Sequence, residues 1–255
     1  MSYLYKEFSI AEKSPPNLNN ETFHVAGDTK MQYKRNRKRQ PDTWYYRHKT
    51  VSYTTNSLGY RTDEFDCIDF DNSIVALGCS MTFGIGVDNA HTWVNHLEGY
   101  LGIPVINLGV PGTSVELATL LSANLRAVHR PRAIIWCWPP VDRYAEYRSP
   151  EQPCITDCVH HYDQWHHLLP KYKGYNYKTD WRAKNLIHMK KDRLLWSDTA
   201  YVETTFFEYE HLDYTSDERI TNLKLLDRGR DLVHPGILSH NIAAKTIKSI
   251  VEKLL

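Results

Sequence analysis

The 255-residue chain has no long hydrophobic run. No segment approaches the roughly 18 consecutive apolar residues that suggest a membrane-spanning helix. The N-terminal segment also lacks the apolar stretch of a secretory signal, since it reads MSYLYKEFSIAEKSPPN. We therefore expect a soluble protein that is not exported by the usual route, is cytoplasmic by default and has no membrane partner.

The chain also lacks an excess of one charge and a disulfide framework. Its 31 Lys and Arg nearly balance its 30 Asp and Glu, and the net charge of +1 provides no whole-molecule attraction to nucleic acid. The five cysteines are odd in number and scattered, which favours reduced thiols. The sequence shows no internal repeat or low-complexity tract. Its length is sufficient for one α/β domain with a sizeable core.

Residues 1–70 differ in composition from the rest of the chain. They are polar, rich in aromatics, poor in helical periodicity and interrupted by Pro15, Pro16 and Pro41. We predict an extended arm or a small β-rich cap that precedes a main domain over residues 71–255. A short basic run lies in this segment and comprises Lys34, Arg35, Arg37, Lys38 and Arg39. We interpret the run as a solvated loop, and contact with a polyanion such as nucleic acid or an acidic polysaccharide is the alternative.

From residue 73, short apolar runs alternate with helix-like segments. The predicted buried strands are Ile74–Leu77, Val105–Leu108 and Ala133–Trp138. The predicted helices cover residues 92–101, residues 114–128 and the C-terminal segment that begins at Pro235 and Gly236. This alternation is typical of βαβ units around a parallel sheet. The sequence therefore predicts a three-layer α/β/α domain with a mostly parallel, flavodoxin-like central sheet.

Residues 144–215 show no clean βαβ unit and are rich in Tyr, Trp and His. We interpret them as an insertion over the carboxyl edge of the sheet, with a helix near residues 180–195 and a strand near residues 201–207. Tyr162 and Trp165 are candidate substrate contacts because aromatic faces stack on sugar rings, although plain packing of the insertion is an equal alternative. Two cysteines and four histidines crowd the same stretch, at Cys154, Cys158, His160, His161, His166 and His167. Their spacing is not a standard zinc pattern, so we predict no metal.

A serine follows the first predicted strand, in the turn Gly78-Cys79-Ser80. Ligands of open α/β sheets bind at this carboxyl edge, and a serine hydroxyl becomes a nucleophile when a base removes its proton. Asp231 and His234 lie immediately before the last predicted helix, where a turn can set Asp231 against one ring nitrogen while the other faces Ser80. We predict a Ser80, His234, Asp231 triad. The alternatives are an ordinary turn serine, a structural histidine and a helix-capping aspartate.

These residues resemble the SGNH (GDSL-like) hydrolase superfamily, whose first block reads G-D-S-x-x-x-G and whose last reads D-x-x-H-P. The corresponding segments are Gly78-Cys79-Ser80-Met81-Thr82-Phe83-Gly84, in which Cys79 replaces an aspartate that is not a triad member, and Asp231-Leu232-Val233-His234-Pro235, which is intact. Asn107-Leu108-Gly109-Val110-Pro111-Gly112 is similar to the second block, N-x-G-x-x-G, and Asn56-Ser57-Leu58-Gly59-Tyr60-Arg61 to a common lead-in. The resemblance implies that the backbone N–H groups of Ser80 and Gly109 stabilise an oxyanion.

The third block departs from the family pattern. Val141 stands where the resemblance places an oxyanion-binding asparagine. Loss of one such donor typically slows catalysis by about 10²–10³. Arg143 is our candidate replacement and Asn107 is a weaker one.

The resemblance implies ester hydrolysis through an acyl-enzyme. We expect a small acyl group, such as acetyl, on a small-molecule or glycan ester, with no cofactor and no nucleic-acid partner. Two alternatives remain: acyl transfer to a sugar hydroxyl, and a carbohydrate-binding or structural protein that has kept the fold with weakened catalysis.

Overall fold

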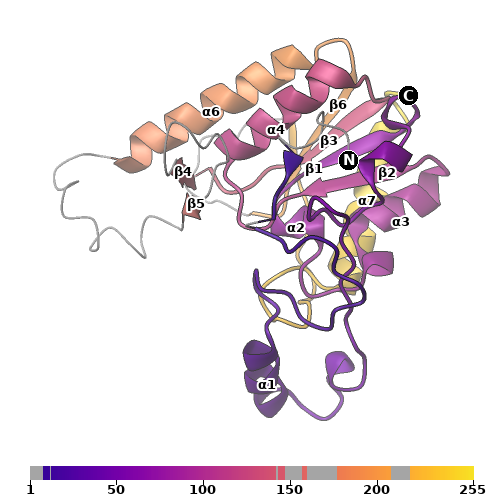
Figure 1. The fold of residues 1–255 in the computed structure, drawn as a ribbon, viewed down its shortest axis with the longest axis vertical. Helices are drawn as coiled ribbons and strands as arrows, with labels where there is room; N and C mark the ends of the chain where they lie inside the picture. The colour runs from indigo at the N-terminus through magenta and orange to yellow at the C-terminus, as the bar shows by residue number, and fades with distance from the viewer. Residues whose placement is uncertain (1–7, 12, 142, 147–156, 160–176, 208–218) are drawn as a thin grey trace.

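A five-stranded, all-parallel sheet forms the centre of the molecule in the computed structural model, which describes residues 8–255 except 12, 142, 147–156, 160–176 and 208–218 (Figure 1). The strand order is β2-β1-β3-β6-β7. The strands are β1 (Ile74–Gly78), β2 (Val105–Gly109), β3 (Ala133–Cys137), β6 (Ala200–Thr205) and β7 (Ile220–Asn222). This order is that of a flavodoxin-like doubly wound sheet, which confirms the predicted fold class.

Helices cover both faces of the sheet. One face carries α4 (Val115–Val128) and α6 (Tyr177–Leu195), and the other carries α3 (Trp93–Leu101) and α7 (Ile237–Val251) (Figure 1). Because side chains alternate along a strand, Leu77 and Trp136 pack in the first layer, whereas Ile74 and Ile135 pack in the second. The strands are therefore apolar on both faces, as expected of a parallel sheet covered by helices.

The predicted insertion is shorter than its proposed bounds, because part of residues 144–215 belongs to the sheet. Helix α6 leads into β6, which pairs in parallel with β3 from Ala133↔Ala200 to Cys137↔Thr204. The segment thus contains a βαβ crossover, which corrects the prediction that it held none. The predicted helix and strand are both present, but the sequence did not reveal that the strand joins the central sheet. Between β3 and α6 lies the antiparallel pair β4 (Tyr144–Glu146) and β5 (Asp157–Val159).

A buried polar network ties α6 to the sheet. The indole rings of Trp136 and Trp138 stack with centroids 3.9 Å apart. Their Nε1–H groups donate to Asp192 at 2.7 Å and to Glu203 at 2.8 Å. Glu203 also pairs with Arg193 at 2.5 Å. We refer to Trp136, Trp138, Asp192, Arg193 and Glu203 as the tryptophan network.

The N-terminal segment is helical where the sequence predicted a loop. Helix α1 (Lys30–Arg39) contains the basic run, and short 3-10 helices follow at Tyr45–Arg47, Phe65–Cys67 and Phe70–Asn72, with another later at Asn89–His91. Between residues 8 and 72, apart from residue 12, the β-structure consists of one isolated bridge, Glu21↔Tyr53. The inward face of α1 makes polar contacts rather than an apolar stripe, so hydrophobic periodicity did not reveal the helix.

Across the ranges that the structure describes, no helix is both long enough and apolar enough to span a membrane.

Candidate active site

Ser80 lies at the junction of β1 and the short helix α2 (Ser80–Phe83), at the carboxyl edge of the sheet. The end of β2 lies directly against this helix. A methyl group at Gly109 would be 2.3 Å from the backbone nitrogen of Phe83, so only glycine allows this approach. The glycine predicted from the second block therefore has a packing role that fixes the position of α2 and of Ser80.

A closed loop presents the histidine and the aspartate. Arg228 and Pro235 form an antiparallel bridge at the base of the loop, and the Gly229 N–H donates to the His234 carbonyl at 2.9 Å. Leu232, at the tip, has a φ of 63°, which is unusual for a residue with a branched side chain. Strained backbone of this kind is common where a turn must aim functional side chains.

The structure brings Ser80 together with Asp231 and His234, which lie at least 151 positions further along the chain. The His234 Nε2 atom lies 2.8 Å from the Ser80 Oγ atom, and the Asp231 carboxylate accepts a hydrogen bond from His234 Nδ1. The exposed fractions are 5% for Ser80, 1% for Asp231 and 8% for His234. With the Nδ1 proton held by Asp231, Nε2 is the acceptor for the serine hydroxyl, which is the arrangement of a general base beside a nucleophile.

The second oxygen of Asp231 holds the loop. Its Oδ1 atom accepts from the backbone N–H groups of Val233 and His234, both at 3.2 Å. The carboxylate therefore orients the imidazole and closes the turn at once. Asp231 does not cap the last helix, α7: the N–H groups of Leu238 and Ser239 in its first turn donate to Asp227, at 3.0 and 2.7 Å.

The predicted oxyanion donors differ in their surroundings. The Ser80 N–H is the first of α2, and the first N–H groups of a helix have no intrahelical acceptor. The Gly109 N–H instead donates to the Asn107 side-chain oxygen at 3.0 Å, and the Asn107 amide donates to the Thr82 carbonyl at 3.0 Å. Asn107 thus braces β2 against α2, and Gly109 is already paired in this conformation.

The third-block loop is anchored by α6 and by the loop that follows β2. Val141 is 1% exposed and belongs to the core, which explains an apolar residue at this position. The Asn185 amide donates to the carbonyls of Val141 and Arg143 at 2.7 and 2.8 Å. The Arg143 guanidinium donates to the Thr113 carbonyl at 3.2 Å. In this conformation Arg143 fixes the loop, and its role as an oxyanion donor stays a prediction.

The N-terminal segment forms one wall of the site, which the sequence did not indicate. Gly27 lies against the imidazole, because a methyl group there would be 3.4 Å from His234 Cε1. From α1, the Gln32 amide donates to the Asp231 carbonyl at 2.8 Å and the Asn36 amide to the Arg230 carbonyl at 3.1 Å. Residues 199 and 194 positions away in the chain thereby hold the loop that bears His234.

A buried ion pair joins the same two segments. Arg230, 1% exposed, pairs with Asp28 at 2.7 Å, and Asp28 also accepts from the Tyr53 hydroxyl at 2.6 Å. The Tyr53 hydroxyl in turn accepts from the Gly86 N–H at 2.8 Å. We refer to Asp28, Tyr53 and Arg230 as the arm lock. Arg230 adjoins Asp231 in the sequence, but nothing in the local pattern marks Asp28 as its partner.

Two further buried groups support this wall. Arg61, from the lead-in that resembles the family, donates to the Gly84 and Val87 carbonyls at 2.7 and 2.9 Å. His24 accepts the Ala26 N–H on Nδ1 at 3.1 Å, so its neutral ring carries the proton on Nε2. Burial, and then the charge of Arg61, lowers the pKa of His24 to about 4. His24 is therefore neutral at pH 7.

The remaining sequence candidates are outside the described residues. This applies to Tyr162, Trp165, Cys154 and the four histidines of the unconventional zinc pattern, and it applies to the side chain of Cys158. Where the structure does describe side chains, no three His, Cys, Asp or Glu residues are grouped so as to hold a metal ion.

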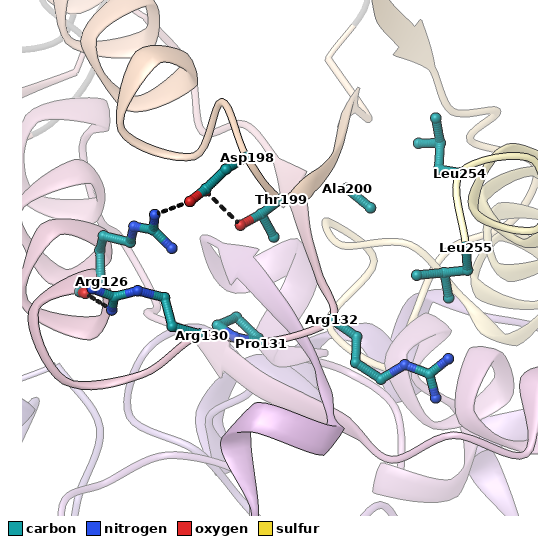
Figure 2. A pocket seen from close by; sticks show the side chains of 9 residues that line it. All are labelled: Arg126, Arg130, Pro131, Arg132, Asp198, Thr199, Ala200, Leu254 and Leu255. Carbon is teal, nitrogen blue, oxygen red and sulfur yellow. Dashed lines mark hydrogen bonds and ion pairs between the residues drawn. The ribbon is translucent and has the colours of Figure 1, made fainter.

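A separate hollow opens at the opposite edge of the sheet (Figure 2). Arg126, Arg130, Arg132 and Asp198 line it, beside the residues that precede β3 and β6. Arg126 pairs with Asp198 at 2.6 Å, as the dashed line in Figure 2 shows. The Thr199 hydroxyl donates to Asp198 at 3.1 Å, but the lining holds no histidine to act as a base, so the candidate active site is the one at Ser80.

Comparison with known proteins gives similarity at the level of structure. No protein-family model matches the chain, and no curated protein matches it. Among solved structures, the chain is similar to a lipolytic protein of the G-D-S-L family from Veillonella parvula, with 14% identity, a TM-score of 0.42 and coverage of 71% of this chain and 99% of that one. It is also similar to a carbohydrate acetylesterase family member from Sinorhizobium meliloti, with 12% identity, a TM-score of 0.42 and coverage of 72% and 99%.

The strand order, the two helical layers and the placement of Ser80 and His234 at the carboxyl edge agree with what the sequence predicted. The chain therefore has a three-layer α/β/α fold with a flavodoxin-like parallel sheet.

Proposed function

We propose that this protein is a serine esterase that hydrolyses a small acyl ester, with Ser80, His234 and Asp231 as its catalytic triad. The observation that carries the proposal is the contact of 2.8 Å between Ser80 Oγ and His234 Nε2, with Asp231 on the other ring nitrogen. All three side chains are nearly buried, so the charges that develop in the reaction are poorly screened by water.

The proposed reaction has two half-reactions. His234 takes the Ser80 proton as Oγ attacks the acyl carbonyl, and the imidazolium then protonates the departing alcohol. A water molecule, deprotonated by His234, releases the acid and regenerates Ser80. Asp231 keeps the Nδ1 proton in place and stabilises the imidazolium throughout.

The Ser80 N–H is the first proposed oxyanion donor. Gly109 contributes its N–H when the oxyanion replaces the Asn107 oxygen as its acceptor. The proposed site has two backbone donors and lacks the asparagine of the third block. We therefore expect a slower reaction than in a site with three donors, and a preference for esters with a good leaving group. The acetyl group and a carbohydrate alcohol are the finer part of the proposal, supported by the aromatic content of the sequence.

The test is turnover of 4-nitrophenyl acetate together with labelling by a fluorophosphonate probe. We expect activity in the wild type and a fall of about 10⁴-fold or more in both Ser80→Ala and His234→Ala, because members of a triad act as a unit. Labelling should map to the peptide that contains Ser80. An inert, unlabelled wild type that still binds glycans would instead support a binding protein. Formation of an acetylated sugar in the presence of an acceptor would favour acyl transfer.

A further inference from the structure

Helix α1 presents an uncompensated basic surface. Six of its ten residues are basic, and all six are exposed: Lys30, Lys34, Arg35, Arg37, Lys38 and Arg39. The helix has no acidic residue, and among the described residues none of the six forms an ion pair. The whole chain carries a net charge of only +1, so the positive charge is concentrated on this helix. We refer to these six residues as the basic face.

The basic face weakens the helix that carries it. Lys30 and Lys34, Lys34 and Lys38, and Arg35 and Arg39 are like charges four positions apart, which repel each other on a helix. Lys30 also lies in the first turn, where the helix dipole disfavours a cation. The dipole favours the three cations of the last turn, Arg37, Lys38 and Arg39, so it is Lys30, Lys34 and Arg35 that have no evident value for the stability of this short helix.

The opposite side of α1 is fixed to the candidate active site. The hydrogen bonds from Gln32 and Asn36 end on the carbonyls of Asp231 and Arg230, at 2.8 and 3.1 Å. Figure 1 shows α1 at the lower end of the molecule, beyond the loop that precedes α7. A polymer bound along the basic face would therefore be held next to the loop that bears His234.

Aromatic side chains adjoin the basic face. Tyr45 is 47% exposed, and Trp44 is partly exposed and stacks on Tyr33 with ring centroids 6.0 Å apart. Cations beside accessible rings match a polymer of acidic sugars, which offers carboxylates for the cations and apolar ring faces for the aromatics.

We propose that the basic face of α1 binds an acidic polysaccharide and holds it beside Ser80, so that the ester substrate is carried on an anionic glycan. This inference rests on the proposed esterase function for the choice of a glycan over a nucleic acid. The carbonyl contacts of Gln32 and Asn36 support that choice, because they connect the basic face to the loop of the proposed triad.

The test measures binding of O-acetylated polygalacturonate to the full chain carrying Ser80→Ala, which prevents turnover. In this background the variant K30Q/K34Q/R35Q should bind at least about 10-fold more weakly. The slope of log Kd against log salt should fall by about 2–3, because each of the three lost cations removes about 0.7–0.9 of a counterion. The matched control K190Q/K191Q/K245Q changes three exposed lysines on other helices and should leave binding as in the parent.

The variant removes like-charge repulsion, so its thermal midpoint should equal or exceed that of the parent, and weaker binding would not reflect unfolding. Equal binding by the two triple variants and the parent would overturn the proposal. Tighter binding of poly(U) than of the polysaccharide would overturn it in favour of nucleic acid.

Failure of the esterase proposal gives a different result. If the wild type binds the polysaccharide through α1 but does not hydrolyse 4-nitrophenyl acetate, the esterase proposal is wrong and the proposed binding site stands. If the wild type hydrolyses 4-nitrophenyl acetate but does not bind the polysaccharide, only the proposed polysaccharide site is wrong. If both proposals hold, the wild-type rate on O-acetylated polygalacturonate should fall with added salt, whereas its rate on neutral acetylated xylan should not.

Discussion

Two arginine–carboxylate pairs, one buried and one partly buried, lie in different parts of the molecule. Arg230 and Asp28 are 202 positions apart, meet at 2.7 Å and join the N-terminal segment to the loop of the proposed triad. Arg193 and Glu203 are 10 positions apart, meet at 2.5 Å and join α6 to β6 inside the tryptophan network. The first pair connects segments that only folding brings together, and the second reinforces a crossover that is continuous in the chain.

The comparison predicts that the arm lock controls the geometry of the active site, whereas the tryptophan network controls the stability of the sheet. Changes to the Asp28–Arg230 pair itself should alter activity as well as the free energy of unfolding. Changes near Glu203 should alter the free energy of unfolding alone.

The largest effect is expected for Asp231→Asn, next to the arm lock. The asparagine oxygen can still accept from the Val233 and His234 backbone, but its NH₂ group would face His234 Nδ1 and reverse the imidazole tautomer. We expect kcat for 4-nitrophenyl acetate to fall by about 10⁴-fold. The thermal midpoint should change little. A variant that retains most of the wild-type kcat would remove Asp231 from the proposed triad.

Arg230→Ala should be the most destabilising single change at the arm lock. It leaves the Asp28 carboxylate buried without its counter-ion, at a cost of about 3–5 kcal/mol in the free energy of unfolding. Urea titration measures this loss, and kcat under folded conditions should fall as well because the loop loses its tether. The double variant Asp28→Asn, Arg230→Met removes both charges and should recover much of the stability. No recovery would show that the pair itself is not the cause.

The pH dependence of stability should also distinguish the two regions. His24 has a pKa of about 4 in the folded protein, lowered by burial and by Arg61, against about 6.5 in the unfolded chain. Between these values the unfolded chain binds more protons, so acidification from pH 6.5 to pH 4 favours unfolding, by about 3 kcal/mol for this group. His24→Asn keeps an acceptor for the Ala26 N–H and should reduce the acid-induced loss by that amount.

Two further variants complete the pH experiment, in which the urea midpoint of unfolding is measured between pH 4 and pH 7. His48→Asn changes an exposed histidine and should leave the profile as in the wild type. Asp192, in the tryptophan network, has its pKa raised to about 6 by burial. The folded chain therefore binds the extra proton between about pH 4 and pH 6, so acidification favours folding at this group. Asp192→Asn should shift the profile in the sense opposite to His24→Asn. If the two variants shifted the pH profile in the same direction, the predicted difference between His24 and Asp192 would be wrong.

The smallest effect is expected for Glu203→Gln. The amide oxygen can still accept from Trp138, but the charge-assisted bond to Arg193 is lost, at a cost of about 1–3 kcal/mol in the free energy of unfolding. Activity toward 4-nitrophenyl acetate should match the wild type. A large fall in kcat with little loss of stability would place the tryptophan network in the active site and abolish the comparison.

The local part of the site could be predicted from the sequence. A buried apolar strand followed by Gly78-Cys79-Ser80 specifies a turn at the carboxyl edge of a parallel sheet, because strands and helices alternate around it. The three-residue step from Asp231 to His234 fits a turn in which one carboxylate meets one imidazole. These features depend on short-range geometry, so residue type and spacing were sufficient to predict them.

Tertiary structure alone decided what surrounds these residues. The pairing of Asp28 with Arg230, the approach of Gly27 to His234 and the anchoring of α1 by Gln32 and Asn36 join positions about 200 residues apart. Such contacts leave no periodic pattern, since each side chain meets its partner only after the sheet has formed. The same reason hid the membership of β6 in the sheet: its parallel pairing with β3 runs across a long crossover, and no local signal records which strand lies beside it.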